Sequence, residues 1–217
     1  MGSECRRAGS SASMNAKGCS RHLVIFARRP RFGVGKRRLA AEVGELAAWR
    51  FQRFALATLL RELAHDPRWK TWLAVTPDRP TNWIRRATPI AQGPGDLGAR
   101  LARLARRLPR GPVVILGSDA PQVGRRDVAA AFRALGGSDA VFGPSVDGGF
   151  WLVGLSLRGR SHPPFEGVRW SSANALADTA ANLPRSKVSY LRELEDVDDA
   201  ASLQRLRSGP LRRAAAV

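Results

Sequence analysis

A basic, glycine-rich stretch follows the first apolar segment of the chain, and its residue types suggest anion binding. FARRPRFGVGKRRL, residues 26–39, contains six basic side chains, two glycines and a proline. Glycines such as Gly33 let a backbone come close to a ligand. Arg28, Lys36 and Arg38 supply donors for phosphate oxygens just before a predicted helix start. Because the order of a Walker loop is absent, the stretch predicts either another kind of phosphate-binding loop or a solvated basic turn.

Carboxylates follow three later segments of the chain. Asp119 comes directly after an apolar run in LGSDAP, Asp147 lies in GPSVDGGF, and Asp198 lies in EDVDDA. A carboxylate held at the end of a stiff strand can ligate Mg²⁺. Each also has a simpler interpretation: Asp119 as a turn cap before a proline, Asp147 as part of a hairpin turn, and Asp198 as a helix cap.

Short apolar runs alternate with amphipathic segments along most of the chain, which predicts an α/β fold with a mainly parallel sheet. Ligands in such sheets bind beyond the carboxyl ends of the strands, so the stretches above are expected at one edge. The predicted strands are 22–28, 71–76, 88–92, 111–121, 139–144 and 150–155, the predicted helices are 40–64, 96–108, 125–135 and 171–182, and a short strand and helix fill 187–207.

Composition limits the class of protein. The chain has 217 residues, enough for one domain, which we expect at 21–208, with a disordered leader at 1–20 and a flexible tail at 209–217. No apolar run approaches the ~20 residues that span a bilayer. Both cysteines lie in the leader, which excludes a disulfide framework and favours a cytoplasmic location.

The net charge of +18 is compatible with a nucleic-acid partner. The arginines are, however, scattered over several predicted helices, which favours a general use of Arg at surface positions. We therefore do not expect nucleic acid as the main partner.

Six stretches in this order resemble the rSAM/selenodomain-associated transferase family, which is similar to the 2-phospho-lactate guanylyltransferases and other small nucleotidyltransferases of GT-A type. The resemblance covers about residues 22–207, and the stretches are FARRPRFGVGKRRL, QGPGDLGAR, ILGSDAP, FGPSVDGGFWLVGL, FEGVRWSS and EDVD. It implies a three-layer αβα sandwich, the nucleotide-diphospho-sugar transferase (GT-A) fold, with a mixed, mainly parallel sheet. The chain departs from the family pattern at Arg37, where the family usually has Thr.

The resemblance also implies roles for individual residues. Lys36 and Arg38, with Arg28 and Gly33 in the same loop, correspond to the part that grips phosphates. Other correspondences are Gly95 and Asp96 near the nucleotide, Asp119 and Asp198 as ligands of Mg²⁺ (or Mn²⁺), and Asp147, Gly148, Gly149 and Trp170 beside the acceptor. Lys36, Asp119 and Asp147 are the expected catalytic residues.

Three functions stay open at this stage. A Lys/Arg loop after the first strand suits a triphosphate, which favours nucleotidyl transfer from an NTP to a small phosphorylated or hydroxyl acceptor. The alternative is a glycosyltransferase that uses an NDP-sugar. A third hypothesis is a non-enzymatic nucleic-acid-binding protein on a degenerate transferase fold, whose affinity would fall steeply with salt. The base, the acceptor and the oligomeric state are not predicted.

Overall fold

The computed structural model describes residues 20–78 and 87–208. The expected tail and all of the expected leader except Ser20 lie outside the described residues. Among the described residues, no helix has the length and apolar character needed to cross a membrane.

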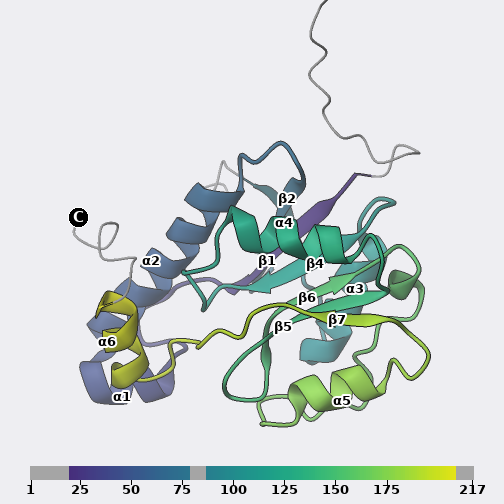
Figure 1. Ribbon diagram of the computed structural model, residues 1–217. Helices are drawn as coiled ribbons and strands as arrows, with labels where there is room; N and C mark the ends of the chain where they lie inside the picture. Colours follow the sequence, from purple (N-terminus) through teal and green to yellow (C-terminus); the bar gives the residue numbers. More distant parts are fainter. Residues whose placement is uncertain (1–19, 79–86, 209–217) are drawn as a thin grey trace, which may run out of the picture.

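A seven-stranded sheet forms the middle of the molecule, in the order β3-β2-β1-β4-β6-β5-β7 (Figure 1). Its pairings are parallel except for those of β6, which is antiparallel to both β4 and β5. The loops that follow the six other strands therefore open at one edge of the sheet, as the sequence predicts. The strands are β1 His22–Arg28, β2 Lys70–Thr76, β3 Thr88–Ile90, β4 Val113–Gly117, β5 Ala140–Pro144, β6 Phe150–Leu155 and β7 Val188–Tyr190.

Helices cover both faces of the sheet, which confirms the three-layer αβα sandwich. On one face, α2 (Glu45–Leu63) and α4 (Arg125–Ala134) pack leucines, valines and Phe132 against the strands. On the other face, α3 (Leu97–Arg107) and α5 (Ala175–Ala181) enclose a second core. Strands β1, β2, β4 and β5 alternate their apolar side chains between these two cores, so residues such as Leu23 and Val24 lie on opposite faces.

The predicted long helix over 40–64 is wrong as a single element. It is split into α1 (Arg37–Val43) and α2, with Gly44 between them at a φ of 84°. The apolar spacing continues across this break, so periodicity could not detect it, whereas only glycine adopts such a backbone readily. The predicted helix over 171–182 also begins later, at Ala175.

A third, smaller core joins the first loop of the chain to its C-terminal part. Leu39 of α1 is fully buried and packs with Phe51 of α2 and with Val197 and Leu203. Leu203 belongs to the last helix, α6 (Ala200–Ser208). This apolar contact brings the EDVDDA stretch next to the glycine-rich loop, although the two lie at opposite ends of the described sequence.

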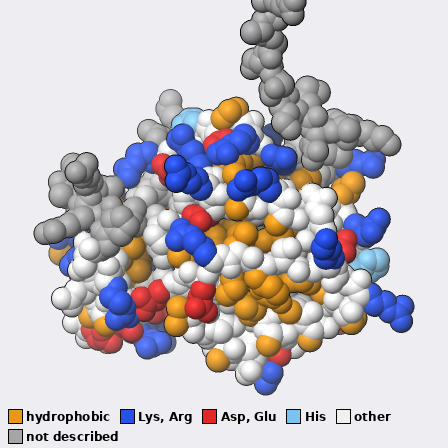
Figure 2. Space-filling model, in the orientation of Figure 1, with side chains coloured by type: hydrophobic (Ala, Val, Ile, Leu, Met, Phe, Trp, Pro, Cys, Tyr) orange, Lys and Arg blue, Asp and Glu red, His pale blue; other side chains and the backbone are white. Residues whose placement is uncertain are grey.

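Basic side chains are spread over the surface of several elements, as the sequence predicts. Figure 2 shows them distributed over the visible face, and acidic side chains gather there near α1 and α6. One arginine is instead buried: Arg160 donates hydrogen bonds of 2.5–2.7 Å to the carbonyl oxygens of residues 105, 108, 109 and 111, at the end of α3 and just after it. Burial lowers the pKa of this guanidinium below its ordinary value.

Arg160→Met should lower the free energy of unfolding by about 3 kcal/mol, because four buried carbonyls would lose a charged donor. Urea denaturation measures this change. The matched control is Arg158→Met, which removes an exposed arginine two residues away. Equal stability of the two variants would show that the four hydrogen bonds of Arg160 contribute nothing specific to the free energy of unfolding.

Candidate functional site

One ammonium group joins three segments at the edge of the sheet where the parallel strands end. The Nζ atom of Lys36 lies 2.9 Å from Oδ2 of Asp119 and 2.6 Å from Oδ1 of Asp198. The Lys36 side chain is 8% exposed, whereas the two aspartate side chains are about half exposed. Burial acts to lower the pKa of Lys36, but the two carboxylates outweigh it and raise that pKa above its ordinary value. The structure thus brings together two expected metal ligands and the expected phosphate-binding lysine.

The backbone at Lys36 is held in an unusual conformation. Its φ of 47° lies in the left-handed region, and Ser171 is the other described non-glycine residue there. Such a conformation costs of the order of 1–3 kcal/mol and persists only where the surroundings enforce it. Here the loop is tied to α2 by a hydrogen bond from Gln52 to the carbonyl of Val34. The strain therefore accompanies a fixed position of the Lys36 ammonium.

Asp119 follows β4, the central strand, by two residues. Its carboxylate pairs with Lys36, and no described backbone amide donates to it. The interpretation of Asp119 as a simple turn cap therefore finds no support among the described hydrogen bonds. The strand is parallel to β1 and antiparallel to β6, so Asp119 stands where the sheet changes from parallel to antiparallel pairing.

The aspartates of the acidic stretch after β7 make two different kinds of contact. Asp199 accepts from the amide and hydroxyl of Ser202, which is helix capping at the start of α6. Asp198 instead reaches Lys36. Asp196 is a further member of the site that sequence analysis did not single out: burial, followed by the charge of Asp119, raises its pKa to about 7. The carboxylates of Asp147 and Asp198 contribute to the same shift, while Lys36 opposes it.

Asp147 lies in the turn of the β5–β6 hairpin, so the hairpin interpretation is correct. It accepts from the amide of Gly149 at 2.9 Å. The φ of Gly148 is 82°, and a Cβ atom there would lie 2.1 Å from the carbonyl oxygen of Ala173. The turn is thus fitted closely against the segment that leads into α5. The Asp147 carboxylate contributes to the raised pKa of Asp196. Asp147 therefore lies within electrostatic range of the Lys36 cluster, by which we mean Lys36, Asp119 and Asp198.

Trp170 connects the start of β6 to α3. Its indole contacts the rings of Phe150 and Phe165, and a Cβ atom at Gly98 would lie 3.0 Å from its Nε1 atom. Gly98 belongs to α3, whose N-cap is Asp96.

The second glycine loop is held by its own capping contacts. Asp96 accepts from the amide of Ala99, and Arg100 donates to the carbonyl of Gly95. Gly95 and Asp96 are exposed, and none of their described contacts joins them to Lys36. Their place near the nucleotide therefore stays a prediction.

Two expected phosphate-binding arginines stand apart from this cluster. Arg28, at the end of β1, is exposed. Arg38 is 77% exposed and lies 3.9 Å from Asp199. Neither has a described contact with Asp119 or Asp198, so their role in phosphate binding stays a prediction.

A buried amide on the same sheet edge was missed by sequence analysis. Gln92 is fully buried, and its Nε2 donates to the carbonyls of Ala27 and Ala74, near the ends of β1 and β2. Asp78 accepts from the amides of Gln92 and Gly93. The available signal was one polar residue at or near the end of each of two predicted strands: Gln92 ends the predicted strand 88–92, and Asp78 follows the predicted strand 71–76 by two residues. This network fixes the start of the QGPGDLGAR stretch.

The two carboxylates beside Lys36 are suitable ligands for a magnesium ion. Mg²⁺ is usually held by one or two carboxylates together with substrate phosphates and water. Asp119 and Asp198 supply two half-exposed carboxylates that already share one cation. Within residues 20–78 and 87–208, no group of three or more metal-ligating side chains is present. A metal held here would therefore depend on ligand phosphates for much of its coordination.

Comparison with known proteins agrees with this architecture. Residues 59–172 match the model of DUF2064, described as uncharacterized proteins conserved in bacteria. The chain belongs to the DUF2064 family. A search of the curated proteins found no match.

Solved structures extend the similarity over nearly the whole chain. A Desulfovibrio desulfuricans G20 protein with a provisional description as a nucleotide-diphospho-sugar transferase is 26% identical, with a TM-score of 0.82 over 90% of this chain and 91% of that one. A 4-diphosphocytidyl-2C-methyl-D-erythritol synthase from Anaerococcus prevotii is 8% identical, with a TM-score of 0.58 over 88% and 96%. A 2-C-methyl-D-erythritol 4-phosphate cytidylyltransferase from Thermus thermophilus is 14% identical, with a TM-score of 0.52 over 88% and 98%. The nucleotide-diphospho-sugar transferase fold is thereby confirmed.

Gly148→Ala should lower the melting temperature by several degrees, because the new methyl group would collide with the backbone of Ala173. Gly167→Ala is the matched control: Gly167 also has a positive φ, of 64°, but open space around its Cβ position. Calorimetric melting of both variants separates the collision from backbone strain. Equal losses would contradict close packing of the hairpin turn.

Proposed function

We propose that this protein is a transferase that moves a nucleotidyl group from an NTP to a small phosphorylated or hydroxyl acceptor. The observation that carries the proposal is the Lys36 ammonium between Asp119 and Asp198. It lies at the carboxyl edge of a sheet whose fold is shared with a structure described as a cytidylyltransferase. This edge is where such sheets bind their ligands.

Nucleotidyl transfer demands cations more than it demands covalent chemistry. An acceptor oxygen attacks the α-phosphorus, the bond from phosphorus to the bridging oxygen breaks, and pyrophosphate leaves with its added negative charge. A hydroxyl acceptor also gives up its proton to solvent. Asp119 and Asp198 would hold Mg²⁺ (or Mn²⁺), which would neutralise the phosphate oxygens when bound. The Lys36 ammonium would then donate to the departing phosphates in place of the carboxylates.

The remaining predicted residues take supporting roles in this proposal. Arg28, Arg38 and the backbone at Gly33 contact phosphates. Gly95 and Asp96 border the nucleotide. Asp147 orients the attacking group of the acceptor, and the hairpin glycines Gly148 and Gly149 with the ring of Trp170 form the acceptor side.

Glycosyl transfer from an NDP-sugar is the second candidate. It is favoured by the similarity to the D. desulfuricans protein, which is described with that type of donor. A diphosphate leaving group requires the same metal-binding carboxylates, so the two reactions share the Lys36 cluster and differ in the donor.

Asp119→Asn should reduce Mg²⁺-dependent turnover at least about 100-fold, because it removes charge where the leaving group is stabilised. Nucleotide binding should also become insensitive to Mg²⁺. Pyrophosphate or nucleoside diphosphate release measures turnover, and Asp139→Asn, at the opposite edge of the sheet, is the control. Unchanged turnover and an unchanged Mg²⁺ response in Asp119→Asn would refute the metal-dependent mechanism.

Lys36→Met should have opposite effects on two ligands. It should tighten the binding of Mn²⁺ alone, because the metal need no longer displace an ammonium from the two carboxylates. It should weaken nucleotide binding by about 1.5–3 kcal/mol through the loss of a charged donor. Electron paramagnetic resonance of free Mn²⁺ and nucleotide calorimetry measure the two effects, with the exposed Lys187→Met as control. Weaker Mn²⁺ binding in Lys36→Met would contradict the proposal that the metal displaces the Lys36 ammonium from the two carboxylates.

A further inference from the structure

Aromatic side chains lie beside the turn of the β5–β6 hairpin, on the side of the site that the proposed function gives to the acceptor. The ring of Phe150, which follows the turn, and that of Trp170 have centroids 6.2 Å apart and an interplanar angle of 72°. Both residues are only partly buried, and Val146 in the turn itself is 64% exposed. Apolar side chains that flank Asp147 in the sequence therefore reach solvent.

The segment that carries Trp170 is held in place by its own contacts. Ser171 has a φ of 59°, and Lys36 is the other described non-glycine residue with a positive φ. A residue persists in this conformation only where its surroundings enforce it. Arg169 supplies part of that constraint, because its guanidinium lies 2.8 Å from Oδ1 of Asp178 and its amide donates to the same carboxylate at 3.0 Å. The indole of Trp170 is therefore attached to a fixed backbone, as the Lys36 ammonium is.

Two arginines close to Trp170, one next to it in the sequence and one in α3, are already bonded within the chain. Arg169 forms the ion pair just described. Arg100 donates to the carbonyl of Gly95 from α3, the helix that packs against the indole. Asp147, by contrast, accepts from a backbone amide and forms none of the salt bridges of the described residues. Asp147 is therefore the charged group that this side of the site offers most directly to a ligand.

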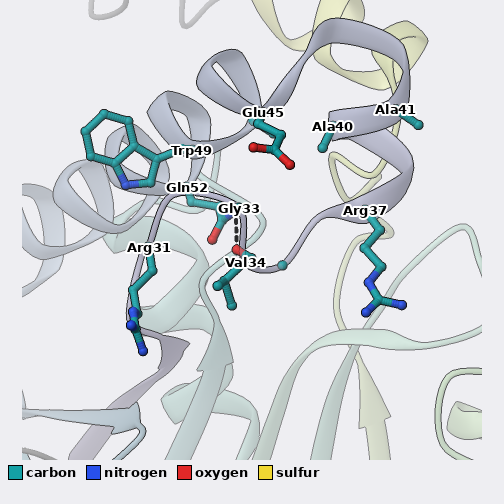
Figure 3. A pocket seen from close by; sticks show the side chains of 11 residues that line it. Arg31, Gly33, Val34, Arg37, Ala40, Ala41, Glu45, Trp49 and Gln52 are labelled. Carbon is teal, nitrogen blue, oxygen red and sulfur yellow. Dashed lines mark hydrogen bonds between the residues drawn. The ribbon is translucent and has the colours of Figure 1, made fainter.

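Arginines without an ion pair are found instead on the glycine-rich loop. Arg31 and Arg37 form none of the salt bridges of the described residues. In Figure 3, their side chains stand far apart, at the two ends of the loop. No described hydrogen bond joins either of them to Asp147 or Trp170. The loop that the proposed function gives to the nucleotide phosphates therefore also carries the cations that suit phosphate groups.

We propose that the acceptor is an uncharged molecule with hydroxyl groups and a ring, and that the ring stacks on Trp170 while a hydroxyl donates to Asp147. This inference rests on the proposed function and narrows its acceptor to one class. An indole packs well against the flat apolar face of a ring. A carboxylate accepts hydrogen bonds from hydroxyls, whereas it repels a phosphate dianion. A phosphorylated acceptor would meet the charge of Asp147 instead of a cation.

Calorimetric titration of the full chain with phenyl β-D-glucoside and with its 6-phosphate tests this proposal. Pyrophosphate and Mg²⁺ in excess occupy the glycine-rich loop, so that the phosphorylated probe reports on the acceptor side alone. The neutral probe should bind at least about tenfold more tightly than the phosphorylated one. Asp147→Asn should narrow this difference, because it removes the charge that repels the phosphate.

Variants at Trp170 test the stacking. Trp170→Leu should weaken binding of the neutral probe about tenfold or more, whereas Trp170→Phe keeps a ring and should retain most of the affinity. Trp72→Leu is the matched control, because Trp72 lies near the start of β2, at the opposite edge of the sheet. It should leave the affinity unchanged, and the melting temperature of each variant reports that it is folded.

Equal or tighter binding of the phosphorylated probe would overturn the proposal. Absence of binding of the neutral probe, or an equal loss of its affinity in Trp72→Leu, would also overturn it. These results leave stabilisation by nucleotides unaffected, so they are distinguishable from failure of the proposed transferase. Once the neutral probe binds as expected, methyl β-D-glucoside and benzyl alcohol show whether the sugar ring or the aromatic ring stacks on Trp170.

Discussion

The structure depends on the neutralisation of one buried ammonium. Lys36 is almost inaccessible to solvent, and its charge is tolerated because carboxylate oxygens of Asp119 and Asp198 lie 2.9 and 2.6 Å from it. Its two partners come from the end of the central strand and from the last loop of the domain. The same contact therefore closes the sheet edge, fixes the glycine-rich loop and brings the C-terminal segment to the first strand. The small core around Leu39 serves the same end, since it packs α1 against α6.

The same arrangement explains how a binding site can remain folded without its ligand. The carboxylates gathered at this sheet edge repel one another, and the raised pKa of Asp196 reflects burial together with that crowding. An ammonium from the protein can occupy the place of the cation and limit the repulsion. In the proposed function, Asp119 and Asp198 would hold a metal ion in place of that ammonium, and Lys36 would donate to phosphates instead of carboxylates. Folding and ligand binding would then use the same three side chains.

The fold, and the common sheet edge of Lys36 and Asp119, could be predicted from the sequence because strand runs and strand-end residues are local signals. Asp119 and Lys36 each follow an apolar run, so their shared edge follows from sheet topology. The break at Gly44 could not be predicted, because apolar spacing is continuous through it. Asp196 was not distinguished from its neighbours, because which of three nearby carboxylates is buried depends on packing.

The most direct test of a nucleotide-dependent transferase centre at Lys36 is the melting temperature of the full chain with a panel of NTPs and NDP-sugars, each with and without Mg²⁺. Ligands that bind the native state raise its melting temperature, and more so at higher occupancy. The account predicts that at least one nucleotide stabilises the protein, and does so more strongly with Mg²⁺. No stabilisation by any nucleotide, together with salt-sensitive stabilisation by DNA or RNA, would contradict it.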